Sequence, residues 1–289
     1  MIRIVLLAAL AVGSAVFATA IAMAWRRQPV RLSLEGVAMS AVANFFDTLG
    51  IGSFAPTTAY LKFRRLIPDE LIPCTMMVGY GLPATLQALV FIGGVKIDPL
   101  LLVLGIAAAI LGGLTGVTVA ARLPVQPIRL VMGIGLLIAA ASFAASALGL
   151  MPPGGTATGL APLPFALVVA ASFLFGVLVN LGIGNFAPTL VLVSLLGMDP
   201  RAAFPLMAGS AGLLTLVAGV RIVRLRPLNM GLAVGMALGG IPAVLVAAFI
   251  VKSLPIEQLR WGVIAVVTYA AAVMLHAALA SPRPAGEPA

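Results

Sequence analysis

The chain has 289 residues, of which 62% are hydrophobic and 9% are charged, and its mean hydropathy is +1.19. Soluble domains carry about 45–50% apolar and about 25% charged residues, so this composition excludes an ordinary soluble domain and predicts a membrane protein. The net charge is +9, but no basic run is interleaved with the aromatic residues that base stacking needs, so nucleic acid is not an expected partner.

A membrane-spanning helix needs about 20 apolar residues, and the first candidate is the stretch 4–25. Arg26 and Arg27 follow it directly, and only Arg3 precedes it. We expect a retained N-terminal helix within residues 1–31, with a periplasmic N-terminus. A cleaved signal peptide is the alternative interpretation.

The next apolar segment, 34–61, has basic residues on both sides. Arg26, Arg27 and Arg31 precede it, and the cluster KFRR at 62–65 follows it. Because cytoplasmic loops carry the excess of Lys and Arg, both ends of this segment are expected in the cytoplasm. The segment is therefore predicted to be a re-entrant hairpin of two half-helices.

Seven further segments follow in chain order. The first half continues to residue 150, residues 151–164 form a turn-rich linker, and the second half runs over 165–280 before a polar tail at 281–289 that is expected to be disordered. We predict helices over 71–94, 100–121 and 128–150, a second hairpin over 165–196, and helices over 203–220, 228–251 and 261–279.

The two halves repeat each other. LGIGSFAPT at 49–57 returns as LGIGNFAPT at 181–189, and the same shift of 132 places Pro68 on Pro200 and Pro73 on Pro205. The pairs GVKI and GVRI, LGG and LGG, and LPVQPIR and LPIEQLR recur in the same order. With both hairpins re-entrant, most basic residues fall on the cytoplasmic side. The predicted fold is all-α and polytopic, with repeats 32–150 and 165–280 inverted about an axis in the membrane plane.

The repeated motif predicts a break between two half-helices, with glycines at the turn and Pro56 or Pro188 in the first turn of the next helix. Free N–H groups and the positive end of that helix favour an anion, whereas close helix packing is the alternative reason for the glycines. The predicted substrate-binding residues are Gly50, Ile51, Gly52, Ser53, Phe54 and Thr57 in the first copy, and Gly182, Ile183, Gly184, Asn185, Phe186 and Thr189 in the second. Other glycines, Gly112 and the series Gly231, Gly235 and Gly239, are expected to serve helix packing.

Asp47 is an acid placed well inside an apolar segment, just before the first break. Such carboxylates are costly in a membrane and commonly functional, so Asp47 is a candidate proton-coupling site. A cap for the free N–H groups of the turn is an equally good reading. The expected pocket-lining neighbours are Asn44, Thr48, Gln87, Asn180 and Thr215, although Gln87 and Thr215 could equally make ordinary interhelical hydrogen bonds.

Several chemistries are not expected. The chain has one cysteine, Cys74, and one histidine, His276, so a thiolate metal cluster is excluded and an imidazole base would have to be His276. GIGSFA around Ser53 is not a nucleophile elbow, and there is no P-loop. We therefore predict no enzyme activity, no metal and no cofactor.

The paired Gly-Pro breaks, the two spaced prolines after each, and the GVKI/GVRI and LGG…LP runs make residues 34–280 similar to the TauE/SafE family of sulfite and organosulfonate transporters. That resemblance implies a multi-pass protein of the bacterial inner membrane that moves a small anion, such as sulfite, an organosulfonate, or a related sulfur oxyanion or carboxylate. The family is typified by G-I-G-G-G, where this chain has GIGSF and GIGNF, so it departs from the family at Ser53 and Asn185.

The resulting expectation is a secondary transporter that works by alternating access around a midplane site, with a passive anion channel as the alternative. Its expected partners are the anion, with proton coupling left open, and the lipid bilayer. The C-terminus is expected in the cytoplasm, and the protein is expected to be a monomer or a homodimer.

Overall fold

The computed structural model describes residues 2–27, 30–49, 52–120, 125–148, 155–179, 185–253 and 256–279. Over these ranges the chain is helical and contains no β-strand. Six of the described helices are long and apolar enough to cross a membrane. The prediction of an all-α, multi-pass membrane protein is therefore confirmed at that level.

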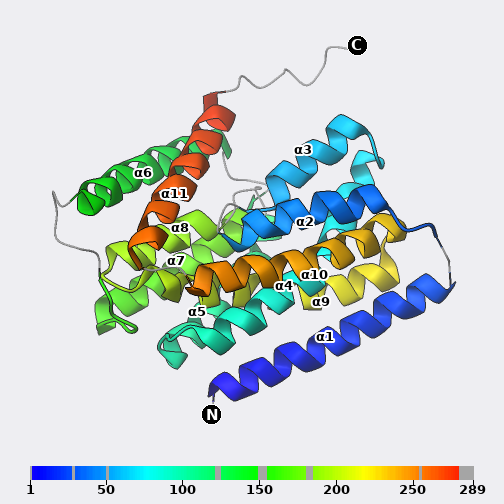
Figure 1. The fold of residues 1–289 in the computed structure, drawn as a ribbon, viewed down its shortest axis with the longest axis horizontal. Coiled ribbons are helices and arrows are strands. Elements are labelled where there is room, and N and C mark those ends of the chain that lie inside the picture. The colour runs from blue at the N-terminus through cyan, green and yellow to red at the C-terminus, as the bar shows by residue number, and fades with distance from the viewer. Residues whose placement is uncertain are drawn as a thin grey trace.

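The helices follow one another with short connections (Figure 1). Their bounds are α1 Ile2–Arg27, α2 Leu34–Thr48, α3 Phe54–Arg64, η1 Asp69–Leu71, α4 Ile72–Gly94, α5 Pro99–Ala120, α6 Val125–Ala147, α7 Pro162–Val179, α8 Phe186–Leu195, η2 Pro200–Ala202, α9 Ala203–Leu225, α10 Met230–Ser253 and α11 Ile256–Leu279.

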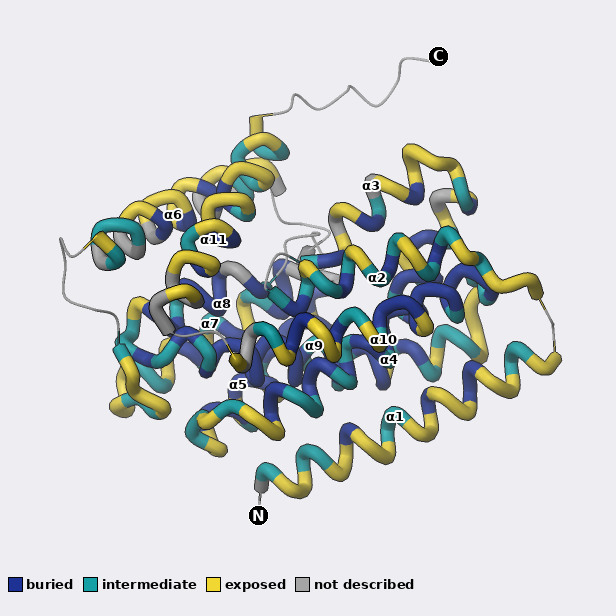
Figure 2. The backbone as a smooth tube through the Cα atoms, in the orientation of Figure 1, coloured by how far each residue is buried: buried dark blue, intermediate teal, exposed yellow. Residues whose placement is uncertain are grey.

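The centre of the molecule is the packed pair α4 and α9. Helix α10 packs on α2 and α4, α5 packs on α7 and α9, and α6 pairs with α11. Helix α1 crosses α4 and α9, and its Phe17 is fully buried against Gly81 of α4 and Gly219 of α9. Buried residues are concentrated along this centre, whereas α3, α6 and the outer face of α1 are largely exposed (Figure 2).

Both copies of the repeated motif break a helix, as the sequence predicts. Helix α2 ends at Thr48 and α3 begins at Phe54, while α7 ends at Val179 and α8 begins at Phe186. Pro56 and Pro188 each lie in the first turn of the second helix, where the missing N–H removes no helical hydrogen bond. Gly52 has φ +85, a left-handed conformation that glycine adopts without strain.

The helices α2 and α3 form a hairpin, called the first hairpin below, whose outer ends are tied together. Glu35 in the first turn of α2 accepts hydrogen bonds from the Tyr60 hydroxyl at 2.7 Å and from Arg64 Nε at 2.9 Å. Tyr60 and Arg64 belong to the last two turns of α3. The start of α2 therefore lies beside the end of α3.

The helices α7 and α8 form the second hairpin, which is closed by backbone bonds. Ala157, before α7, bridges to Met198, after α8, through Ala157 N–H to Gly197 C=O at 3.3 Å and Asp199 N–H to Ala157 C=O at 2.9 Å. This closure lies next to η2, at the start of α9. The first hairpin instead closes near the start of α10, where Ser33 N–H bonds to Gly231 C=O. The closed outer ends of the two hairpins therefore lie at opposite ends of α9. The outer end of the first hairpin lies near the C-terminal end of α9, and that of the second lies near its start.

The glycines assigned to packing do bring helices together. A Cβ at Gly112 of α5 would collide with the Phe173 carbonyl of α7, and one at Gly239 of α10 would collide with the Val37 carbonyl of α2. Gly231 and Gly235 meet the backbone carbonyls of residues 31 and 33 in the same way. Here the packing prediction is confirmed.

Two helices continue past the ends expected from hydropathy. Helix α3 runs to Arg64 rather than Leu61, and α9 runs to Leu225 rather than Val220. Lys and Arg are good helix formers, so a helix does not stop where its residues become charged. The α3 helix ends instead at Arg65, whose left-handed φ of 50 allows a C-cap with N–H bonds to Leu61 and Lys62 carbonyls.

Candidate functional site

The start of α3, which we call the first tip, has a buried side, formed by Ser53 and Thr57, whereas Phe54 is 46% exposed. Ser53 occupies the N-cap position and is 3% exposed. The first N–H groups of a helix have no helical partners and carry the positive end of its dipole. The first tip therefore presents unsatisfied donors at depth.

Asp47 of α2 faces this tip. Its carboxylate interacts with the hydroxyl and the backbone N–H of Ser53, and with the side chain of Gln87 on α4. The cap interpretation is thus compatible with the geometry, since the carboxylate reaches an N–H group at the break. Proton coupling uses the same position and stays a prediction.

Gln87 is the polar side chain of α4 at this level. It is 1% exposed, and its Nε2 makes no normal hydrogen bond to any described residue. A buried amide without a partner costs roughly 1–3 kcal/mol, so such a group points to a missing acceptor. Gln87 was predicted to line the pocket, and it does lie beside the tip.

Tyr80 joins the same group of residues, although the sequence analysis did not select it. Its hydroxyl shares a hydrogen bond with Thr57, its ring lies 5.5 Å from the ring of Phe54, and it feels the charge of Asp47. Tyr80 is 2% exposed. The available signal was a phenol flanked by glycines in VGYG, within an otherwise apolar helix.

No described atom fills the space beside the turn. A Cβ at Gly52 would meet no described atom within 4 Å. The glycine is therefore required by its backbone conformation rather than by crowding.

The second tip is the start of α8, where Asn185 is the N-cap residue. Asn185 Nδ2 donates to Ser210 Oγ of α9 at 3.4 Å, and Ser210 donates to the Met207 carbonyl at 2.9 Å. Thr189 and Phe186 are buried. The predicted residues Gly50, Ile51, Asn180, Gly182, Ile183 and Gly184 lie outside the described residues.

Both tips reach the α4–α9 interface at nearly the same depth. Gly212 of α9 packs against Ala88 of α4, the neighbour of Gln87. Ser210 lies two residues from Gly212, which is less than one helical turn. The Asp47–Gln87 contact beside the first tip and the Asn185–Ser210 contact of the second therefore lie at similar positions along the α4–α9 interface.

The remaining predicted residues, Asn44, Thr48 and Thr215, make hydrogen bonds within their own helices. Asn44 donates to Ser40, and Thr48 donates to the Asn44 carbonyl at 2.8 Å, on the side of α2 that packs on α10. Thr215 bonds back to carbonyls of its own helix, at Ala211 and Gly212. None of these three needs a ligand to satisfy its hydrogen bonds.

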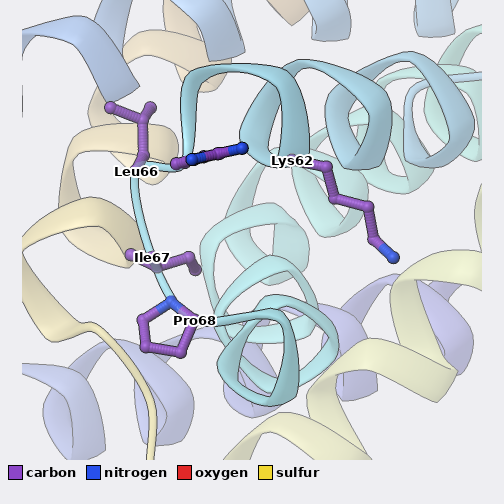
Figure 3. A pocket seen from close by; sticks show the side chains of 5 residues that line it. Lys62, Leu66, Ile67 and Pro68 are labelled. Carbon is purple, nitrogen blue, oxygen red and sulfur yellow. The ribbon is translucent and has the colours of Figure 1, made fainter. Parts of the chain in front are cut away.

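A separate hollow of about 520 Å³ lies at the outer end of the first hairpin (Figure 3). Its lining is Lys62, Arg65, Leu66, Ile67 and Pro68. It belongs to the basic surface loop between α3 and η1 and does not include either tip.

The described residues offer no group of three side chains that could bind a metal ion. Cys74 is a free, half-buried thiol, and His276 is exposed in the last turn of α11. The sequence also has no Lys, Arg or His in segments 34–61, 66–95 or 202–220, which carry α2, most of α3, α4 and the buried part of α9.

Comparisons with protein-family models, curated proteins and solved structures return no match. The chemical character of the site therefore comes from its own residues. It combines two helix N-termini, hydroxyl and amide donors and one carboxylate.

Proposed function

We propose that this protein is a secondary transporter that moves a small anion across the membrane by alternating access around the two tips. The observation that carries the proposal is the convergence of two half-helix N-termini on one level of the α4–α9 interface. Helix N-termini at membrane depth favour negative charge, and broken helices at the midplane are a recurrent binding device in transporters.

The pairing of helices supports two copies of one unit. If every helix is exchanged for its counterpart in the other half, the extensive contact α5–α7 becomes the equally extensive contact α10–α2. The pairs α4–α9 and α6–α11 become themselves. These pairings support the proposal of two units related by a two-fold axis.

The positions of the outer ends of the two hairpins support an inverted relation between the two units. The outer end of the first hairpin lies near the end of α9, and that of the second lies near its start. Helix α9 has 23 residues, about 34 Å, which is enough to cross a bilayer. The ends of α1, α3 and α9, which carry many of the basic residues, gather at one end of the molecule (Figure 1). We assign that end to the cytoplasm of a bacterial cell, with the N-terminus on the periplasmic side.

The substrate class rests on the resemblance to TauE/SafE transporters together with the chemistry of the tips. Sulfite, an organosulfonate or a related oxyanion has the small size and the acceptor oxygens that Ser53, Gln87 and Asn185 can satisfy. Ser53 and Asn185 stand where the family has glycine, so they are the residues expected to adjust selectivity. Asp47 is the proposed coupling group.

A passive anion channel is the second candidate, because paired half-helices would also suit a pore. The test is uptake into proteoliposomes that contain the purified protein, with sulfite, methanesulfonate, acetate and sulfate as probes. A carrier predicts saturable uptake and accelerated exchange when the same anion is present inside. Conductance that rises linearly without saturation would favour the channel, and no uptake of any probe would contradict both.

A further inference from the structure

The charge balance of the tips limits what the site can hold. On the assumption that this is the anion site of the proposed transporter, we propose that it holds one net negative charge at a time, either the Asp47 carboxylate or a singly charged substrate. The transporter would then move monoanions together with one proton, without net charge movement, and reject dianions.

The positive side of the balance comes from the helices. Helices α3 and α8 have 11 and 10 residues, and each N-terminus is equivalent to about half an elementary charge. Two N-termini at one level therefore supply about one positive charge. That amount neutralises one monoanion.

At the first tip, no Lys, Arg or His of α2, of α4 or of residues 230–251 of α10 adds to this charge. Around Asp47, α4 contributes Tyr80 as the ionisable group, and residues 230–251 of α10 contain none. The ionisable groups of α3 are in its last two turns, where Tyr60 and Arg64 bind Glu35. The cluster around the first tip thus has one carboxyl group and no ammonium, guanidinium or imidazolium group.

Two observations indicate that a ligand belongs here. Gln87 is buried beside the tip and faces the Asp47 carboxylate, but its Nε2 makes no hydrogen bond of normal geometry to any described residue. The space next to Gly52 is also unoccupied by any described atom. An oxyanion placed there would give the Gln87 amide an acceptor and would reach the N–H group of Ser53.

The Ser53 N–H group interacts with the Asp47 carboxylate, so this carboxylate and a substrate anion compete for the same donor. In an environment of low dielectric constant, two like charges a few ångströms apart repel by several kcal/mol. Binding of a monoanion is therefore accompanied by the transfer of one proton from water to the Asp47 carboxylate. On the other side the substrate leaves and Asp47 releases that proton, so one negative and one positive charge have crossed together.

A dianion would leave one negative charge uncompensated even with Asp47 protonated. Sulfate should therefore neither be taken up nor compete with methanesulfonate. Sulfite uptake should follow the concentration of the hydrogensulfite monoanion as the pH is varied. Methanesulfonate is a monoanion throughout the usable range and serves as the reference.

The experiment measures methanesulfonate uptake into proteoliposomes under either a pH gradient or a potassium diffusion potential set with valinomycin. Wild-type uptake should be driven by the pH gradient and be unaffected by the potential. Asp47→Asn mimics the protonated carboxyl, so its uptake should become insensitive to the pH gradient and driven by the potential. Asp47→Glu should retain the wild-type pattern.

Gln87→Leu should raise the KM for methanesulfonate about tenfold, because the loss of one hydrogen bond to a charged group costs about 1.5 kcal/mol. Ser172→Ala is the matched control, since this buried hydroxyl of α7 bonds to its own helix at Val168. Elution of each variant as a single species in detergent establishes that it is folded.

The outcomes distinguish a failure of the charge rule from a failure of the transport proposal. If wild-type protein takes up methanesulfonate and sulfate equally, or if its uptake responds to the potential, the charge rule is wrong while the transport function stands. The rule is also wrong if folded Asp47→Asn remains driven by the pH gradient. If none of the probes is taken up, the transport proposal itself fails.

Discussion

At the scale of single residues, Gly52 determines the geometry of the first tip. Its φ of +85 turns the chain from α2 into α3 over a few residues, and no described neighbour would collide with a side chain there. The surrounding space would accept a side chain at this position, but the backbone conformation disfavours one, because L-residues rarely adopt this φ. The conformation is therefore the reason for glycine here.

Gly52→Ala is expected to destabilise the protein by about 1–2 kcal/mol through backbone strain alone. Gly93→Ala is the matched control, because it lies in α4 with open space around it and without a positive φ. That control should be neutral or stabilising, since alanine is the better helix former. Unfolding in mixed micelles would compare the two, and equal effects would contradict the argument.

The predictions for single residues were confirmed where the backbone properties of the residue itself determine the local structure. The conformation of Gly52 and the first-turn position of Pro56 follow from backbone properties that the motif displays directly. Tyr80 was missed because its role depends on how α4 approaches α3, which no local pattern reveals. For the same reason no local pattern revealed that Asn44 bonds to Ser40, which in turn bonds to Met236 of α10.

At the scale of elements, the two half-helices differ in their surroundings. Helix α8 contacts α6, α7, α9, α11 and η2, whereas the substantial contacts of α3 among the described residues are with α2 and α4. Phe63 and Tyr60 of α3 are exposed, at 86% and 36%. Helix α3 is therefore the less constrained of the two, and its outer end depends on the contact with Glu35.

We expect Glu35→Gln to increase the mobility of the outer end of α3 without unfolding the protein. The substitution removes the charge that binds Tyr60 and Arg64. A spin label at Phe63→Cys, in a Cys74→Ser background, would report the change as faster side-chain motion. Arg65→Gln is the control at the same helix end and should leave the label unchanged.

The same contact has a defined pH dependence. Arg64, and then Tyr60, lower the pKa of Glu35, which lies at the surface end of the hairpin outside the membrane-spanning helices. A lowered carboxyl pKa means that the stabilisation is present above the ordinary value of about 4.3 and is lost as the pH falls through the lower folded value. The wild-type label should therefore become mobile only in acid, and mobility that rises with increasing pH would contradict this.

Element positions were predictable from apolar runs, because a spanning helix must satisfy its own backbone bonds. Helix ends were less predictable, as α3 and α9 show by continuing through Arg64 and Arg224. The closure of the hairpins could not be foreseen in detail. It depends on contacts such as Ala157 with Met198, which join residues far apart in the sequence.

At the scale of the whole molecule, the proposed orientation predicts which surface residues share a side of the membrane. Single cysteines at Phe63 and Arg27, in a Cys74→Ser background, should both react with a membrane-impermeant maleimide from the cytoplasmic side. A cysteine at Thr156, near the closure of the second hairpin, should react from the opposite side. Labelling of Phe63→Cys and Arg27→Cys from different sides would contradict the re-entrant arrangement.

Phe17 has a consequence for how such a molecule can move. Its ring is fitted between Gly81 and Gly219, so a helix without a counterpart in the repeat fastens the two central helices to each other. A rocking motion that separated α4 from α9 would expose a phenyl ring and leave a gap against both glycines. In the proposed transporter the central pair would therefore act as a fixed frame, and the displacement that changes access would belong to the hairpins and to the α6–α11 pair around it.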